Sequence, residues 1–144
     1  MTETVTLPYK PRWYQAQFER AMFDGKRFAF LLYHRRAGKD IACWNFMVNE
    51  ALKRKGLYVY ALPDYAQGKK VIWQGMNEQG QRFIDYIPPI LIEKTNNTDM
   101  RVELVNGSAI QVIGSMTYDR FRGANVIGCV LSEYAYHHPI VTGM

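Results

Sequence analysis

Short apolar runs alternate with amphipathic segments along this chain, and the alternation predicts its helices and strands. Three continuous apolar runs have the length and composition of buried strands: 27–33, 57–62 and 126–131. Apolar residues at a spacing of three or four, or residues that open a helix, predict four helices: 13–22, 39–55, about 65–76 and about 78–86.

Turn-forming residues separate these segments. The residues at 24–26 end the first helix, and Gly56 ends the second. The Asn-Gly pair at 106–107 suits a tight turn, so the strands 101–105 and 108–113 are expected to form a hairpin. Further breaks, turns or loops are expected at 88–89, 96–99 and 115–125.

This order of elements predicts an α/β fold with an open, largely parallel sheet flanked by helices and an inserted β-hairpin. A chain of 144 residues fits one domain with a real core. Ligands of such sheets bind at the carboxyl ends of the strands. Lys39 and Glu133 each follow a buried strand, so both are expected at that edge although they lie far apart in the sequence.

The segment 33–40, Tyr-His-Arg-Arg-Ala-Gly-Lys-Asp, lies between the first strand and the second helix. A strand, a tight loop with Gly-Lys and a helix form the layout of a phosphate-binding P-loop. The start of a helix offers unpaired N–H groups, and Lys39 adds a charge for a β- or γ-phosphate. The expected nucleotide-binding residues here are Arg35, Arg36, Ala37, Gly38, Lys39 and Asp40.

Three positions depart from the standard P-loop pattern. Tyr33 replaces the first Gly of the loop, and Asp40 replaces the Ser or Thr that ligates magnesium. At the end of the strand 126–131, Ser132 stands in the place of an Asp, and Glu133 in that of the Glu that positions water. Because the loop has gained a carboxylate and the strand a hydroxyl, we expect Asp40 and Ser132 to face each other and hold Mg²⁺. The alternative is a degenerate site that binds weakly.

Arg35 and Arg36 lie inside the loop itself. Because a guanidinium group binds phosphate through two hydrogen bonds, one of them is expected to reach the γ-phosphate as charge develops. Arg35 is the favoured residue, and it and Glu133 are the expected catalytic residues. The alternative role for either arginine is a salt bridge with a nearby carboxylate.

Composition adds only broad limits. The net charge of +5 permits contact with nucleic acid without requiring it. The chain has no apolar run of membrane-spanning length and no secretory signal pattern, so a cytoplasmic location is expected. Cys43 and Cys129 lie in apolar runs and are expected to be reduced residues of the core.

Taken in order, these motifs resemble the N-terminal ATPase domain of the large terminase subunit of tailed bacteriophages, a motor that pumps DNA into the capsid. Five segments carry the resemblance: 12–15, 35–39, 61–73, 121–126 and 131–135. The resemblance implies a P-loop NTPase fold of the RecA/ASCE type, with ATP and Mg²⁺ as cofactors. It also implies that Gln15 reads adenine, as in the Gln motif of related helicases; the alternative is an ordinary solvent-facing helix residue.

The same resemblance implies partners and a domain layout. The expected partners are double-stranded DNA, a portal protein, a small terminase subunit and, in a full-length parent, copies of the chain in a ring; no membrane is expected. Residues 1–144 are expected to form a single partial ATPase domain, with a lead-in and Gln-motif helix at 1–26 and the P-loop core at 27–144. The core is expected to be C-terminally incomplete, without the family's later strands and nuclease domain. Two other functions stay open: an inactive truncated remnant, and a helicase-like DNA translocase.

Overall fold

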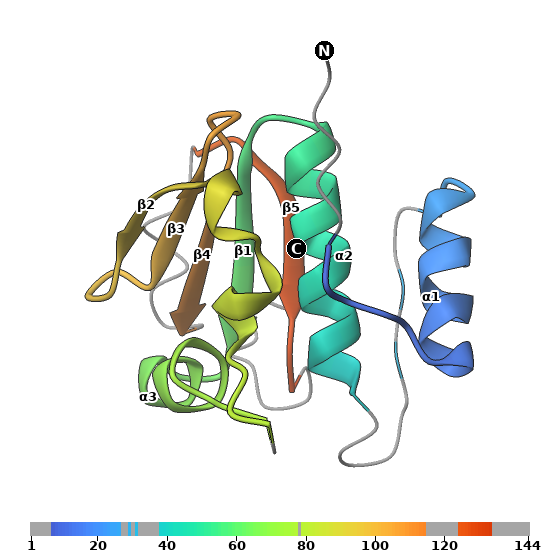
Figure 1. Cartoon of the computed structure of the whole chain (residues 1–144), viewed down its shortest axis with the longest axis horizontal. Helices are drawn as coiled ribbons and strands as arrows, with labels where there is room; N and C mark the ends of the chain where they lie inside the picture. The colour runs from blue at the N-terminus through green and yellow to red at the C-terminus, as the bar shows by residue number, and fades with distance from the viewer. Residues whose placement is uncertain are drawn as a thin grey trace.

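The structure, a computed structural model, describes residues 7–26, 29, 31, 38–77, 79–114 and 124–133. These residues form a five-stranded sheet with helices against it (Figure 1). The strands are β1 (Leu57–Leu62), β2 (Ile92–Asn96), β3 (Arg101–Leu104), β4 (Ala109–Gly114) and β5 (Val126–Leu131). The helices are α1 (Trp13–Phe23), α2 (Lys39–Lys53) and α3 (Tyr65–Gln67), a π-helix η1 (Gly68–Trp73), and two 3-10 helices, η2 (Phe83–Tyr86) and η3 (Pro89–Leu91).

The sheet has the strand order β2-β3-β4-β1-β5. β1 lies between β4 and β5 and runs parallel to both, whereas β2, β3 and β4 form an antiparallel ribbon. The predicted α/β class is therefore confirmed, but the sheet within the described residues is mixed and not largely parallel. The hairpin is also no mere insertion, because its strand β4 is the parallel neighbour of β1.

Most predicted elements are confirmed with small changes at their ends. The first two helices, the strand 57–62, the hairpin and the strand 126–131 all form. The helix predicted over 65–76 ends at Trp73, and the helix predicted over 78–86 is wrong except for the short turn η2. Asn77 explains the second error, because its side-chain oxygen accepts the N–H groups of Gln79 and Gln81 and so stabilises a turn instead of a helix.

β2 is a strand that the sequence pattern does not predict. Its residues are mostly polar, and the three central side chains are exposed. Asn96, at its end, accepts the N–H groups of Thr98 and Asp99, which builds the turn into β3. The expected turn at 96–99 is thus confirmed with a shift of one residue, to 97–100.

The strand predicted over 27–33 lies mostly outside the described residues. Only Ala29 and Leu31 of that segment are described, and they belong to neither a helix nor a strand. Most of the loop predicted over 115–125 also lies outside the described residues.

The main core fills the space between α2 and one face of the sheet. Trp44, Met47 and Val48 of α2 pack against Tyr58 and Tyr60 of β1, all of them buried. The Trp44 and Tyr60 rings lie with their centroids 5.8 Å apart. This packing holds the start of α2 over the carboxyl end of β1, which positions the site described below.

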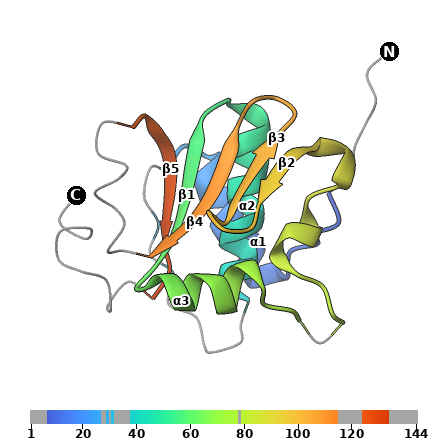
Figure 2. The ribbon, with the colours of Figure 1, turned by 90° about the vertical axis from the view of Figure 1, so that its left-hand side faces the viewer.

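β5 lies at one edge of the sheet, as Figure 2 shows from the side. It was expected to be a buried strand, but its residues are half-buried and Cys129 is exposed. The prediction that Cys129 belongs to the core is therefore wrong, because no strand or helix among the described residues covers the outer edge of β5. In the described part of the chain, no helix is both long and apolar enough to cross a membrane.

Candidate functional site

The candidate site begins at the N-terminus of α2. Gly38 precedes the helix with φ 81° and ψ 27°, a left-handed backbone that glycine adopts without steric penalty. A side chain there would also meet the amide nitrogen of Gln15 at 2.5 Å. Lys39 and Asp40 follow in the first turn, where backbone N–H groups lack partners within the helix.

Asp40 meets two hydroxyl groups from distant parts of the chain. The Ser132 hydroxyl, at the end of β5, donates to Asp40 Oδ1 over 2.7 Å, and the Tyr60 hydroxyl, on β1, donates to the same oxygen over 2.5 Å. We refer to Asp40, Tyr60 and Ser132 as the carboxylate cluster. Asp40 and Ser132, which were expected to face each other because their departures from the P-loop pattern are complementary, are thus in contact. Their role as magnesium ligands stays a prediction.

Sheet pairing explains how Ser132 reaches this position. Leu131 pairs with Ala61 in the parallel ladder between β5 and β1, and the Ser132 N–H then donates to the Ala61 carbonyl over 2.9 Å. The carboxyl ends of β1 and β5 therefore lie next to each other, at the same end of the sheet. Because α2 packs over β1, its first turn lies at that end too.

Tyr60 is the member of the cluster that sequence reasoning missed. It lies in the apolar run 57–62, a pattern that indicates only packing, and its ring is indeed fully buried. Burial, and then the negative charge of Asp40, raise the pKa of the Tyr60 phenol well above its ordinary value, so the hydroxyl stays a donor at neutral pH. The available signal was the hydroxyl itself, because a buried tyrosine hydroxyl needs a partner.

The carboxylate of Asp40 has no ion-pair partner in the described part of the chain, where the ion pairs are Glu50–Lys53 and Arg101–Glu103. Its negative charge affects a neighbour on α2: burial, and then Asp40, raise the pKa of the Cys43 thiol to about 12. Within the described part of the chain, the cluster therefore presents a half-buried negative charge that is stabilised by hydrogen bonds and not by an ion pair.

A cavity of about 430 Å³ opens beside the cluster. Its lining includes the charged residues Lys39, Asp40 and Glu133, together with apolar residues such as Val71 and Phe83. Lys39 and Glu133 thus share one edge of the sheet, as predicted. Glu133 is exposed and has φ 56°, a conformation that is uncommon for residues other than glycine and that clusters at functional sites.

Gln15 is buried and its amide group is engaged at both ends. Its nitrogen donates to the Gly38 carbonyl over 2.9 Å, and its oxygen accepts the Arg12 N–H over 2.8 Å. Gln15 therefore ties α1 to the start of α2, and the solvent-facing alternative is wrong. Its role in reading adenine stays a prediction; among the described residues, one amide hydrogen and one lone pair of the oxygen have no partner.

The remaining loop residues lie outside the described residues. These are Arg35, Arg36 and Ala37, so their predicted roles stay predictions.

The donor set fits magnesium only together with a nucleotide. No group of three or more His, Cys, Asp or Glu side chains that could hold a metal occurs among the described residues. Mg²⁺ in nucleotide sites, however, usually takes one or two protein oxygens and completes its shell with phosphate oxygens and water. Asp40 and Ser132 offer such a pair of oxygens.

Comparison of the chain with models of known protein families, with curated proteins and with solved structures finds no match. The resemblance to terminases accordingly depends on the sequence motifs alone.

Proposed function

We propose that this chain binds ATP with Mg²⁺ at the N-terminus of α2 and hydrolyses it. The observation that carries the proposal is the hydrogen bond between Ser132 and Asp40, two residues 92 positions apart that both depart from the P-loop pattern. One departure alone favours a degenerate site. Two departures that restore a hydroxyl and a carboxylate in contact favour a working one.

Each residue then has a role in phosphoryl transfer. Lys39 and the N–H groups of the first turn bind the β- and γ-phosphates. Ser132 and Asp40 would hold Mg²⁺: the serine oxygen would offer a lone pair to the metal while its hydroxyl proton, still bonded to the serine, is donated to Asp40. Held by these two side chains, the metal would supply positive charge beside the phosphate oxygens.

Hydrolysis needs a water molecule in line with the bond that breaks. Glu133 orients this water, whose oxygen attacks the γ-phosphorus as the bond from phosphorus to the β–γ bridging oxygen breaks. Arg35 stabilises the charge that develops on the γ-phosphate. ADP and phosphate leave as products.

The biological role we propose is that of the ATPase part of a viral DNA-packaging motor of the terminase large-subunit type, acting in the host cytoplasm. Support comes from the order of the five motifs and from the net charge of +5, which suits contact with DNA. Portal protein, small terminase subunit and further copies of the chain are the partners of that role, and a helicase-like translocase is the closest alternative.

A nucleotide-binding protein without turnover is the second candidate. The position of β5 favours it, because this strand is half-buried at the edge of the described sheet while the residues after it carry Ser132 and Glu133. Because β5 has a described neighbour on one side only, fewer described contacts hold Glu133 in place, and a water-positioning residue must be held precisely to act.

The first test is ATP binding by calorimetric titration with and without Mg²⁺, for the wild type, Lys39→Ala and Lys53→Ala. Lys53 lies in the last turn of the same helix, exposed and far from the cavity, and serves as the matched control. We expect Lys39→Ala to weaken binding about tenfold or more, because it removes a charge-assisted contact, and Lys53→Ala to leave it unchanged. A wild type that melts cooperatively but binds no ATP would contradict the proposal.

A further inference from the structure

Tyr60 reaches the site from inside the core. Its ring is fully buried and packs against Trp44, and its hydroxyl, the one polar atom of the side chain, donates to Asp40 Oδ1. Ser132 donates to that oxygen as well. One carboxylate oxygen on α2 is therefore held by a donor from β1 and a donor from the end of β5.

This arrangement restricts the carboxylate. A carboxylate oxygen has two lone-pair sites, and the two hydroxyl groups fill both sites of Oδ1. Within the described residues the second oxygen, Oδ2, accepts no hydrogen bond. Among the described residues, the side chain is thus oriented through one oxygen, and the other is left for a further ligand.

We propose that Tyr60 is a positioning residue for magnesium: its hydroxyl fixes Asp40 so that Oδ2 and the Ser132 oxygen together receive the Mg²⁺ of a bound nucleotide. This inference rests on the proposed function. Tyr60 itself touches neither metal nor nucleotide; it acts through Asp40, as residues outside the metal shell commonly orient the ligands inside it.

Tyr58 shows what a purely structural tyrosine looks like on the same strand. It lies two residues before Tyr60 on the same face of β1 and is also buried. Its hydroxyl donates to the backbone carbonyls of Glu50 and Arg54, at the C-terminal end of α2. The two tyrosines therefore share ring packing and a buried hydroxyl, but only Tyr60 donates to an ionisable side chain.

The experiment compares Tyr60→Phe with Tyr58→Phe. ATP affinity is measured by calorimetry in Mg²⁺ and in EDTA, and the ratio of the two affinities gives the magnesium enhancement. We expect Tyr60→Phe to reduce this enhancement about tenfold, the usual effect of losing a hydrogen bond to a charged group, with affinity in EDTA unchanged within about twofold. Tyr58→Phe is expected to lower the melting temperature and to leave the enhancement unchanged.

A double-mutant cycle with Asp40→Asn tests the route of the effect. If Tyr60 acts through Asp40, then Tyr60→Phe causes no further loss of enhancement once Asp40 is replaced. If the wild type and Tyr60→Phe bind ATP with equal magnesium enhancement, the inference about Tyr60 is overturned but the proposed function is not. A wild type without ATP binding overturns the proposed function and this inference together.

A second measurement does not depend on the stability of Tyr60→Phe. Incorporation of 3-fluorotyrosine at position 60 keeps the ring and the hydroxyl, and its fluorine resonance reports on the hydroxyl's surroundings. We expect this resonance to shift when ATP is added with Mg²⁺ but not with EDTA, and the same label at position 58 to show no shift. No shift at position 60, or equal shifts at both positions, overturns the inference.

Discussion

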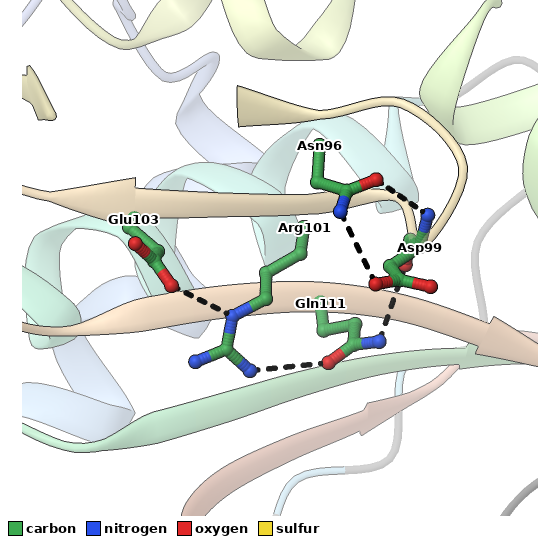
Figure 3. A network of polar contacts seen from close by, with 5 residues as sticks. All are labelled: Asn96, Asp99, Arg101, Glu103 and Gln111. Atoms are coloured by element: carbon green, nitrogen blue, oxygen red, sulfur yellow. Dashed lines mark hydrogen bonds and ion pairs between the residues drawn. The ribbon is translucent and has the colours of Figure 1, made fainter. Parts of the chain in front are cut away.

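The carboxylate cluster and the polar network on the hairpin ribbon both stabilise a carboxylate side chain, but with different partners. The ribbon network, shown in Figure 3, consists of Asn96, Asp99, Arg101, Glu103 and Gln111. In it Arg101 pairs with Glu103 over 3.3 Å and donates to the Gln111 side chain over 3.3 Å. Gln111 in turn donates to the Asp99 carbonyl, so the turn after β2 is tied to β3 and β4.

The difference between the two lies in charge balance and depth. The ribbon network contains a guanidinium group paired with a carboxylate, and the two side chains are 35% and 40% exposed. The carboxylate cluster contains a carboxylate that forms no ion pair among the described residues, and one of its donors, Tyr60, is fully buried. The ribbon network is a surface ion pair that needs no further ligand, whereas a half-buried carboxylate without an ion pair among the described residues is compatible with our proposal that a cation completes the site.

The largest expected effect comes from removing the charge of the carboxylate cluster. Asp40→Ala is expected to abolish the magnesium enhancement of ATP binding and to slow hydrolysis about a hundredfold or more, because the metal loses an oriented ligand. Arg101→Ala, in the ribbon network, is the control and is expected to change neither. Steady-state phosphate release and calorimetry measure both variants; equal losses in the two would remove the distinction between the clusters.

The next effect concerns the exchange of the two ligands. Asp40→Ser and Ser132→Asp are each expected to lose most of the magnesium enhancement, since each leaves two hydroxyls or two carboxylates in contact. The double variant returns the standard P-loop residues at these two positions and is expected to recover ATP binding to within about tenfold of the wild type. A double variant no better than the weaker single variant would speak for a degenerate site.

A smaller effect is expected at the start of α2. Gly38→Ala forces alanine into a left-handed backbone and displaces the Gln15 amide, so we expect a loss of about 1–3 kcal/mol in the free energy of unfolding. Gly25→Ala is the control: Gly25 also has a positive φ, 99°, but has no atom within 4 Å of the added carbon. Urea denaturation compares them. A loss no larger than in Gly25→Ala would show that the Gln15 contact contributes nothing.

The smallest effect is expected in the ribbon network. Arg101→Met keeps the aliphatic stem and removes the pair with Glu103, for an expected loss of about 0.5 kcal/mol that shrinks in high salt. Urea denaturation at low and high salt measures it. A loss of several kcal/mol would place the ribbon network among the main determinants of stability and reverse the comparison.

The sequence predicts the fold well where one periodicity dominates. The strand 57–62 and the helix that begins at Lys39 have strong apolar patterns, and both form within two residues of their expected ends. The mostly polar β2 escapes prediction because its partner β3, and not its own pattern, makes it a strand. The helix expected over 78–86 fails because Asn77 offers the backbone a competing turn.

The candidate site divides in the same way. The pairing of Asp40 with Ser132 could be predicted, because two departures from one motif complement each other. The part played by Tyr60 could not, because the pattern treats a tyrosine in an apolar strand as packing. Its acceptor is found only once α2 packs over β1 and the two side chains meet.

The sequence by itself determined the main helices and strands, the α/β class and the residue types at the site, because local periodicity and turn chemistry depend on neighbours within a few positions. Only the tertiary structure decided that the sheet of the described residues is mixed, that β5 lies at its edge there and that Tyr60 and Ser132 share one oxygen of Asp40. The physical reason is that strand order, register and the partners of buried polar groups follow from packing between segments far apart in the chain.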